Sequence, residues 1–158
     1  MNAELYQIGV VAIAAGLGAL IGIEREYADK PAGLRTHMFV CAASAMLMIL
    51  GDAVLEKFLE DQTGSVRADP IRTIQAIVVG ISFLGAGTII HHNDNRVEGL
   101  TTASSILLTA GIGIAVAIGQ LLFATGVTLF AVIVLVIVGH VEKRIARRAK
   151  PHLPDKTP

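Results

Sequence analysis

Charged residues stand where the first two apolar runs of this chain are joined, and their types limit the chemistry available there. Glu24 follows the first run, and Arg35 and His37 begin the second. A carboxylate at the carboxyl end of a helix is disfavoured by the helix dipole, so Glu24 needs a compensating cation. Arg25 is adjacent and points to another side of the helix. We therefore predict an ion pair between Glu24 and Arg35 that closes a helical hairpin.

Hydroxyl groups mark the starts of the second and fourth apolar runs. Thr36 opens one, and Thr101 and Thr102 open the other, so two helix amino ends would face the same side of a membrane. Such ends favour a substrate anion, a lipid phosphate or a partner's carboxylate. Ordinary helix capping also explains these threonines and is their more frequent role. The candidate functional polar cluster consists of Glu24, Arg25, Arg35, Thr36, His37, Thr101 and Thr102.

Other chemistry has little support in the sequence. A metal site in the third connection would rest on His91, His92, Asp94 and Glu98. Adjacent histidines on a helix diverge, and the spacing matches no common metal motif. No nucleophile with a base, phosphate-binding loop or dinucleotide fingerprint is visible. We predict no metal site, no cofactor and no enzymatic activity.

The elements that carry these residues are apolar runs of nearly membrane-spanning length. Apolar types make up 53% of the 158 residues, and the 16% that are charged are confined to a few stretches. This pattern is typical of an integral membrane protein, in which a spanning helix needs roughly 20 residues. The predicted fold class is all-α, with five transmembrane helices at about residues 5–23, 36–50, 71–90, 100–118 and 121–138.

The connection between the second and third runs allows two local predictions. Residues 36–50 give roughly 22 Å of helix, which is short for a span, so either Arg35 and His37 or Asp52 should be drawn toward hydrocarbon. The apolar residues within 54–59 share one helical face and predict a short separate helix on the outer surface. Asp69 followed by Pro70 predicts the start of the third helix.

Lys and Arg residues set the predicted orientation. They dominate the first connection and the tail, which should be cytoplasmic, whereas the second connection is rich in acidic residues. We predict an amino terminus outside and a carboxyl terminus inside. A transmembrane domain would occupy residues 1–140 and a basic cytoplasmic tail residues 141–158. The same basic residues also suit simple topology anchoring. The formal net charge of zero conceals this asymmetry and says nothing about nucleic acid; we expect no nucleic-acid partner.

Small residues are spaced for close helix packing. Gly18 and Gly22 form a GxxxG pattern. Aligning Gly18 with Gly85 brings Gly33 within one residue of Gly99, which favours two parallel hairpin repeats plus a fifth helix. Chance similarity among small apolar residues stays the alternative. The predicted packing glycines are Gly18, Gly22, Gly80, Gly85, Gly87 and Gly111.

Four linked motifs, at residues 18–26, 33–37, 80–90 and 99–103, resemble the MgtC/SapB family. The resemblance implies a multi-pass protein of the bacterial inner membrane, linked to magnesium homeostasis or to survival inside phagocytes. For some members an association with the proton-translocating ATP synthase has been proposed. The matching positions are Glu24, Arg25, Gly33, Arg35, Thr36, Gly99 and Thr101.

The chain departs from the family in two ways. Many members continue into a soluble carboxy-terminal domain, so the resemblance implies a short member that lacks it. Some virulence-associated members carry Asn at the position of Thr101, which leaves a virulence-related role open. We expect a non-enzymatic regulator that associates with another membrane complex; the alternative is a small ion or solute transporter. Membrane lipids and a second copy of the chain, in a homo-oligomer and first of all a dimer, are the other expected partners.

Overall fold

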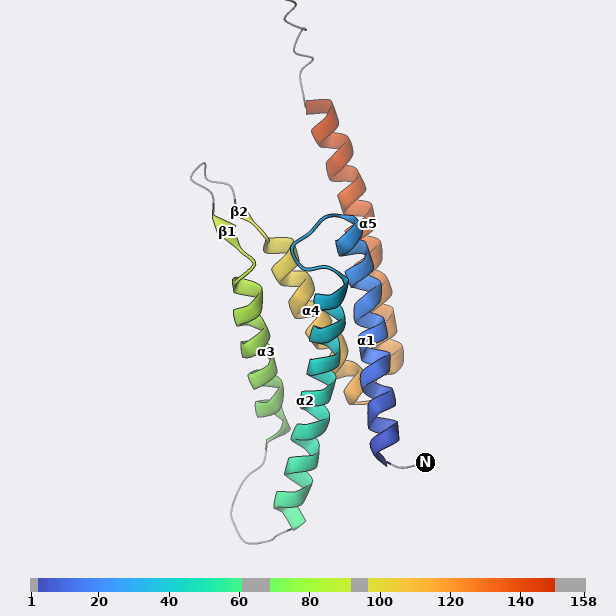
Figure 1. Ribbon diagram of the computed structural model, residues 1–158, viewed down its shortest axis with the longest axis vertical. Helices are drawn as coiled ribbons and strands as arrows, with labels where there is room; N and C mark the ends of the chain where they lie inside the picture. Colours follow the sequence, from blue (N-terminus) through green and yellow to red (C-terminus); the bar gives the residue numbers. More distant parts are fainter. Residues whose placement is uncertain (1–2, 61–68, 92–96, 150–158) are drawn as a thin grey trace, which may run out of the picture.

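A computed structural model describes residues 3–60, 69–91 and 97–149. The regular elements of this part are five helices and one short antiparallel strand pair (Figure 1). The helices are α1 (Ala3–Tyr27), α2 (Leu34–Glu60), α3 (Pro70–Ala86), α4 (Leu100–Ala117) and α5 (Leu121–Ala149), and the strands are β1 (Ile90–His91) and β2 (Val97–Glu98).

The helices form one bundle with alternating directions. One end of the bundle, which we call the hairpin end, carries the α1–α2 connection and the β1–β2 pair (Figure 1). Helices α1, α3 and α5 run toward this end, whereas α2 and α4 run away from it (Figure 1). Helix α3 lies on one flank and packs mainly on α4 and α2, and α5 packs on α1 and α4. The α1–α2 and α3–α4 hairpins are therefore parallel to each other.

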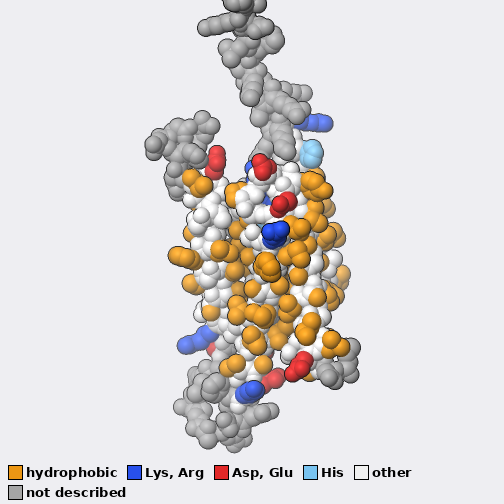
Figure 2. All heavy atoms as spheres, in the orientation of Figure 1, with side chains coloured by type: hydrophobic (Ala, Val, Ile, Leu, Met, Phe, Trp, Pro, Cys, Tyr) orange, Lys and Arg blue, Asp and Glu red, His pale blue; other side chains and the backbone are white. Residues whose placement is uncertain are grey.

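Length and composition identify a membrane protein. Four helical segments are long and apolar enough to cross a bilayer: Ala3–Tyr27, Leu34–Lys57, Leu100–Ala117 and Leu121–Val141. Helix α3 is also apolar but has only 17 residues. Hydrophobic side chains form a broad band, with charged side chains toward the two ends (Figure 2). The predicted all-α membrane fold is confirmed.

Several predicted boundaries were wrong. Helix α2 continues to Glu60, so residues 54–59 extend this helix and form no separate element, and the second span is not short. Helix α3 ends at Ala86, four residues early, and leads into β1. Helix α5 runs to Ala149, beyond the predicted end at 138, although its apolar spanning segment is Leu121–Val141. The predicted start of α3 is confirmed, because Asp69 caps it by accepting a hydrogen bond from the Ile71 amide at 3.0 Å.

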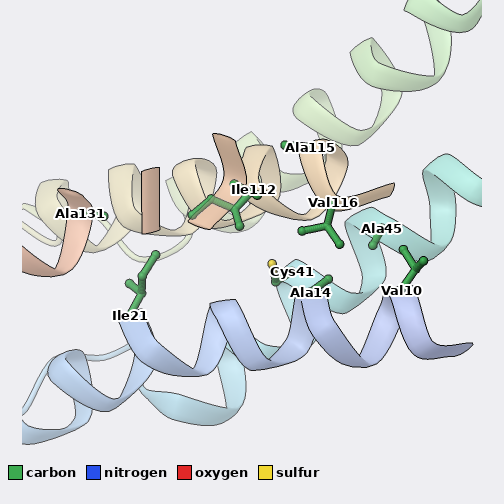
Figure 3. Packing of buried hydrophobic residues seen from close by; sticks show 10 residues of the cluster. Val10, Ala14, Ile21, Cys41, Ala45, Ile112, Ala115, Val116 and Ala131 are labelled. Carbon is green, nitrogen blue, oxygen red and sulfur yellow. The ribbon is translucent and has the colours of Figure 1, made fainter. Parts of the chain in front are cut away.

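The core is built largely from small side chains, which lets the helices approach closely. Its members are Val10, Ala14 and Ile21 of α1, Cys41 and Ala45 of α2, Ile112, Ala115 and Val116 of α4, and Ala124 and Ala131 of α5 (Figure 3). Cys41 is a fully buried free thiol that points between α1 and α4 (Figure 3). The sulfur therefore serves as a small packing group.

Three glycines allow especially close contacts of α2 with α1 and α4. A Cβ atom at Gly18 would overlap the His37 carbonyl oxygen, and one at Gly22 would lie 2.7 Å from Leu34 Cα. Gly113, which the sequence analysis did not select, lies equally close to the Cys41 carbonyl. The predicted packing roles of Gly80 and Gly111 find no support, because nothing lies within 4 Å of a Cβ there. A Cβ at Gly87 would meet only carbonyl oxygens at the end of its own helix.

Candidate functional site

The α1–α2 connection positions the charged residues. Helix α1 ends where Asp29 adopts a left-handed conformation with φ of 54°. The Lys30 amide then donates to the Arg25 carbonyl at 3.1 Å. Such a bond back across the last turn satisfies carbonyl groups that a helix end leaves open. The chain can thus reverse while Glu24 and Arg25 stay on the last helical turn.

Glu24 pairs with its sequence neighbour. Arg25 Nε donates to Glu24 Oε2 at 2.6 Å, and the two side chains are only 5% and 15% exposed. Among the described residues, the ion pair of Glu24 is with Arg25 and not with the predicted partner Arg35, which lies exposed on the first turn of α2. The Arg25 side chain is long enough for its guanidinium to fold back toward the Glu24 carboxylate, although adjacent residues on a helix point in different directions. The negative charge at the end of α1 is compensated locally.

Glu26 has a structural role that the sequence analysis missed. Its Oε2 accepts a hydrogen bond from the Leu34 amide at 2.9 Å and so caps the start of α2 from the preceding helix. Gly33 makes this possible, since a Cβ there would overlap the Glu26 carboxylate. The signal was the absence of a Ser, Thr, Asp or Asn cap just before α2, which left the first amides of the helix in need of an acceptor.

His37 is the most buried ionisable side chain of the predicted cluster and has 0% exposure. Its Nδ1 lies 2.9 Å from the Gly33 carbonyl, which can only accept, so Nδ1 carries a hydrogen. Its Nε2 lies 3.1 Å from Ser105 Oγ in α4. His37 thereby connects the turn before α2 with the neighbouring helix.

Around His37, the facing sides of α2 and α4 carry several buried polar side chains. Ser105 Oγ lies 2.9 Å from the Thr102 carbonyl, and the Thr109 hydroxyl donates to the Ser105 carbonyl at 2.8 Å. Ser44 lies farther along α2, where a Cβ at Gly113 of α4 would come within 3.1 Å of its side chain. Its buried hydroxyl finds no partner among the described residues. We call the set His37, Ser44, Thr102, Ser105 and Thr109 the polar seam.

The two threonines that open α4 point to different surroundings. Thr102 is buried in the seam with 2% exposure, whereas Thr101 is exposed. Thr36 is half-buried on the first turn of α2. The predicted cluster is therefore divided: His37 and Thr102 lie inside the bundle, and Arg35 and Thr101 lie on its surface.

A groove of about 700 Å³ brings part of the cluster together on the side of the bundle. Its walls come from the last turns of α1, the α1–α2 connection, the start of α4 and the middle of α5. Among its lining residues are Glu24, Arg25, Thr101 and His140. Arg35 is not among them. The apolar lining residues Leu20 and Ile23 are 45% and 41% exposed, so the groove opens laterally.

The structure describes only some of the residues that were considered for a metal site. In the described ranges, no three His, Cys, Asp or Glu side chains are grouped so that they could hold a metal ion. Of the four residues considered in the third connection, His92 and Asp94 lie outside the described residues, as does the side chain of His91. Glu98 is exposed in β2.

The fold and the site define a multi-pass helical membrane protein with a polar seam inside and a lateral groove at one end. The sequence model of the MgtC family matches residues 11–144. The chain therefore belongs to the MgtC family, as the four motifs indicated.

Similar proteins occur in several bacteria. The chain is 40% identical over 121 residues to the "Putative magnesium transporter YhiD" of Escherichia coli K12, covering 76% of this chain and 54% of that protein. It is 36% identical over 129 residues to "Protein MgtC" of Salmonella typhimurium, covering 82% and 51%. It is 33% identical over 115 residues to "Protein SapB" of Bacillus subtilis, covering 73% and 47%. The chain thus spans about half the length of these relatives. No solved structure matches it significantly.

Proposed function

We propose that this protein is a non-enzymatic regulator of the inner membrane that acts under magnesium limitation by associating with another membrane complex. The names of its relatives, MgtC and a putative magnesium transporter, connect the family with magnesium. The ATP synthase is the first partner to examine, because an association with it has been proposed for some members of the family. The proposal includes a homodimer, an amino terminus outside and a cytoplasmic hairpin end.

The lateral groove is the observation that carries this proposal. A transport pathway would require the polar groups to converge inside the bundle or on an axis between subunits. Glu24 and Thr101 instead line a groove that opens sideways, and Arg35 lies apart from both. The Glu24–Arg25 pair is already neutralised, so a partner helix can cover it without leaving a carboxylate unpaired.

A second function is supported by the polar seam. Buried polar groups in membrane helices often mark paths for ions or protons. The seam joins His37 to Ser105, and the Ser44 hydroxyl, which has no partner in the part of the chain that the structure describes, leaves room for a hydrogen bond to a passing ligand or water. A small transporter would use this seam, with His37 near its hairpin end.

Flux measurements in proteoliposomes separate the two functions. We would measure magnesium and proton flux with the wild type, the Glu24→Gln and His37→Ala variants, and empty vesicles. The regulator predicts no flux above the empty-vesicle control. Flux that depends on either residue would establish a transporter and overturn the docking proposal.

A growth assay tests the groove directly. The variants are expressed in a strain that lacks the gene. Ile23→Trp fills the groove, whereas Ile13→Trp places the same bulk on an exposed part of α1 outside the groove lining. We expect only Ile23→Trp to lose complementation at limiting magnesium, with both variants inserted at equal levels. Equal complementation by the two variants would contradict docking in the groove.

A further inference from the structure

The lateral groove changes character along its length. Its walls are formed mainly by α1 and α5, which run in the same direction (Figure 1). On α1 the lining passes from Leu20 to Glu24, and on α5 it passes from Val132 to His140. Both walls therefore become polar toward the hairpin end. The lined part of α5 spans roughly 12 Å. We call the part of the groove at Leu20 and Val132 its apolar half, and the part that also holds Glu24, Lys30 and His140 its polar half.

The polar half carries an excess of positive charge. Among the described lining residues, Arg25 and Lys30 are the cations and Glu24 is the carboxylate, which gives these residues a formal charge of +1 without His140. Arg25 is already bound to Glu24. Lys30 is an exposed residue of the α1–α2 connection. Its ammonium group is thus an exposed cation of the described lining that can meet an incoming anion.

The lining as a whole matches an amphipathic ligand. A free anion would use only the polar half and leave the apolar walls facing hydrocarbon. A lipid molecule would cover both, with its chain along apolar lining residues such as Leu20 and Leu135 and its head group at the basic residues. The groove is also open to the bilayer, since Ile23 and Val136 on opposite walls are 41% and 38% exposed. A lipid can therefore enter from the side.

We propose that this groove is a binding site for one anionic phospholipid. The head-group phosphate contacts Lys30 and the Thr101 hydroxyl, and one acyl chain lies against Leu20, Val132 and Leu135. The site rests on the groove itself and does not require that a partner docks there. If a partner helix does dock, the lipid must leave first, so the bound lipid competes with the partner.

A lipid titration of the full chain in a mild detergent tests the site. Native mass spectrometry reads the fraction of protein that carries one phosphatidylglycerol or one phosphatidylcholine. We expect phosphatidylglycerol to bind more tightly. Lys30→Gln should weaken its binding about fivefold, the contribution of one lysine near an anionic lipid. Arg35→Gln should have no effect, since this exposed cation at the start of α2 is outside the groove lining.

A second pair of variants tests the apolar half. Val136→Trp fills the groove and should reduce binding of both lipids, whereas Ile137→Trp adds the same bulk next to it, outside the lining, and serves as the control.

Three outcomes would contradict the site. Equal effects of Lys30→Gln and Arg35→Gln would show that the lipid is held only by general attraction to surface cations. Unchanged binding by a folded Val136→Trp variant would place the lipid elsewhere. Displacement of phosphatidylglycerol by inorganic phosphate would identify a free-anion site instead. Each of these outcomes overturns the proposal. Lys30→Gln changes only an exposed side chain, so the comparison of Lys30→Gln with Arg35→Gln does not depend on whether the tryptophan variants fold.

Discussion

Gly18 of α1 lies directly against the backbone carbonyl of His37 in α2. Gly85 of α3 stands in the same relation to Ala103 of α4, although the packing is looser, since a Cβ added at Gly85 would lie 3.5 Å from the Ala103 carbonyl oxygen. His37 comes four residues after Gly33, and Ala103 comes four residues after Gly99. The two hairpins thus repeat one glycine contact at corresponding positions. This relation supports the hairpin repeat, with closer packing in the first copy.

The difference in packing predicts different tolerance to alanine. Gly18→Ala should lower the free energy of unfolding by about 1–3 kcal/mol, because the new methyl group meets the helix backbone and cannot be accommodated by a rotamer change. Gly85→Ala should be tolerated, because its Cβ would make ordinary van der Waals contact. Unfolding in mixed micelles with increasing SDS measures both values.

Gly16 provides a matched control on the same helix. Nothing lies within 4 Å of a Cβ at Gly16, so Gly16→Ala should be neutral or stabilising by up to about 1 kcal/mol. A similar loss of stability for Gly16→Ala and Gly18→Ala would show that helix contact is not the cause.

The hydrogen bond between His37 and Ser105 should contribute measurably to stability. Ser105→Ala removes the partner of His37 Nε2 inside the bundle. Interhelical hydrogen bonds in membrane proteins contribute about 0.6 kcal/mol on average and up to about 1.7. A double-mutant cycle of His37→Ala and Ser105→Ala should give a coupling energy in this range. Ser104→Ala is the control, since the exposed Ser104 hydroxyl bonds only to carbonyls of its own helix. A coupling energy near zero would contradict the bond.

Two glycines with positive φ separate backbone strain from steric overlap. Gly119, in the turn after α4, has φ of 79° and open space around it, so Gly119→Ala should cost about 1–2 kcal/mol from strain alone. Gly99 has φ of 92°, and a Cβ there would also overlap the Thr88 carbonyl oxygen. Gly99→Ala should therefore be clearly more destabilising in the same unfolding assay. Equal losses would remove the role assigned to the Thr88 contact.

Orientation can be measured by cysteine labelling, because the single native Cys41 is buried. In a Cys41→Ala background, a cysteine replaces either Lys30 or Lys57, which are both exposed and lie toward opposite ends of α2. The distribution of basic residues predicts that Lys57→Cys reacts with an impermeant maleimide in intact spheroplasts. Lys30→Cys should react only after permeabilisation. The reverse pattern would invert the proposed topology.

The sequence was sufficient to predict where the helices lie, but it predicted their ends less well. Apolar runs located all five helices, because burial in hydrocarbon demands long apolar segments. The end of α2 was misjudged because Asp52, Glu56 and Lys57 interrupt the apolar run. A helix can continue past the hydrocarbon edge into the interfacial region, where charged side chains are solvated, so composition alone did not mark its end.

The candidate site was predictable in outline and not in its pairings. The residue types indicated a polar connection and a helix start rich in hydroxyls, and the structure brings Glu24, Arg25 and Thr101 to one groove. Which cation meets Glu24 depends on side-chain reach, and the partner of His37 depends on the register between α2 and α4. Neither quantity is encoded in a local motif. Ser105 therefore gained its role only in three dimensions.

The short third helix has a consequence for the surrounding bilayer. At 17 residues α3 is about 26 Å long, whereas the 25 residues of α1 give about 38 Å. Residues such as Val79 and Phe83 are 69% and 84% exposed, so this helix meets lipid over much of its surface. Hydrophobic mismatch is then different on the two flanks: the lipid tails beside α3 must shorten or the whole bundle must tilt. A host membrane with shorter acyl chains would thus relieve the mismatch beside α3 and reduce the need for tilt.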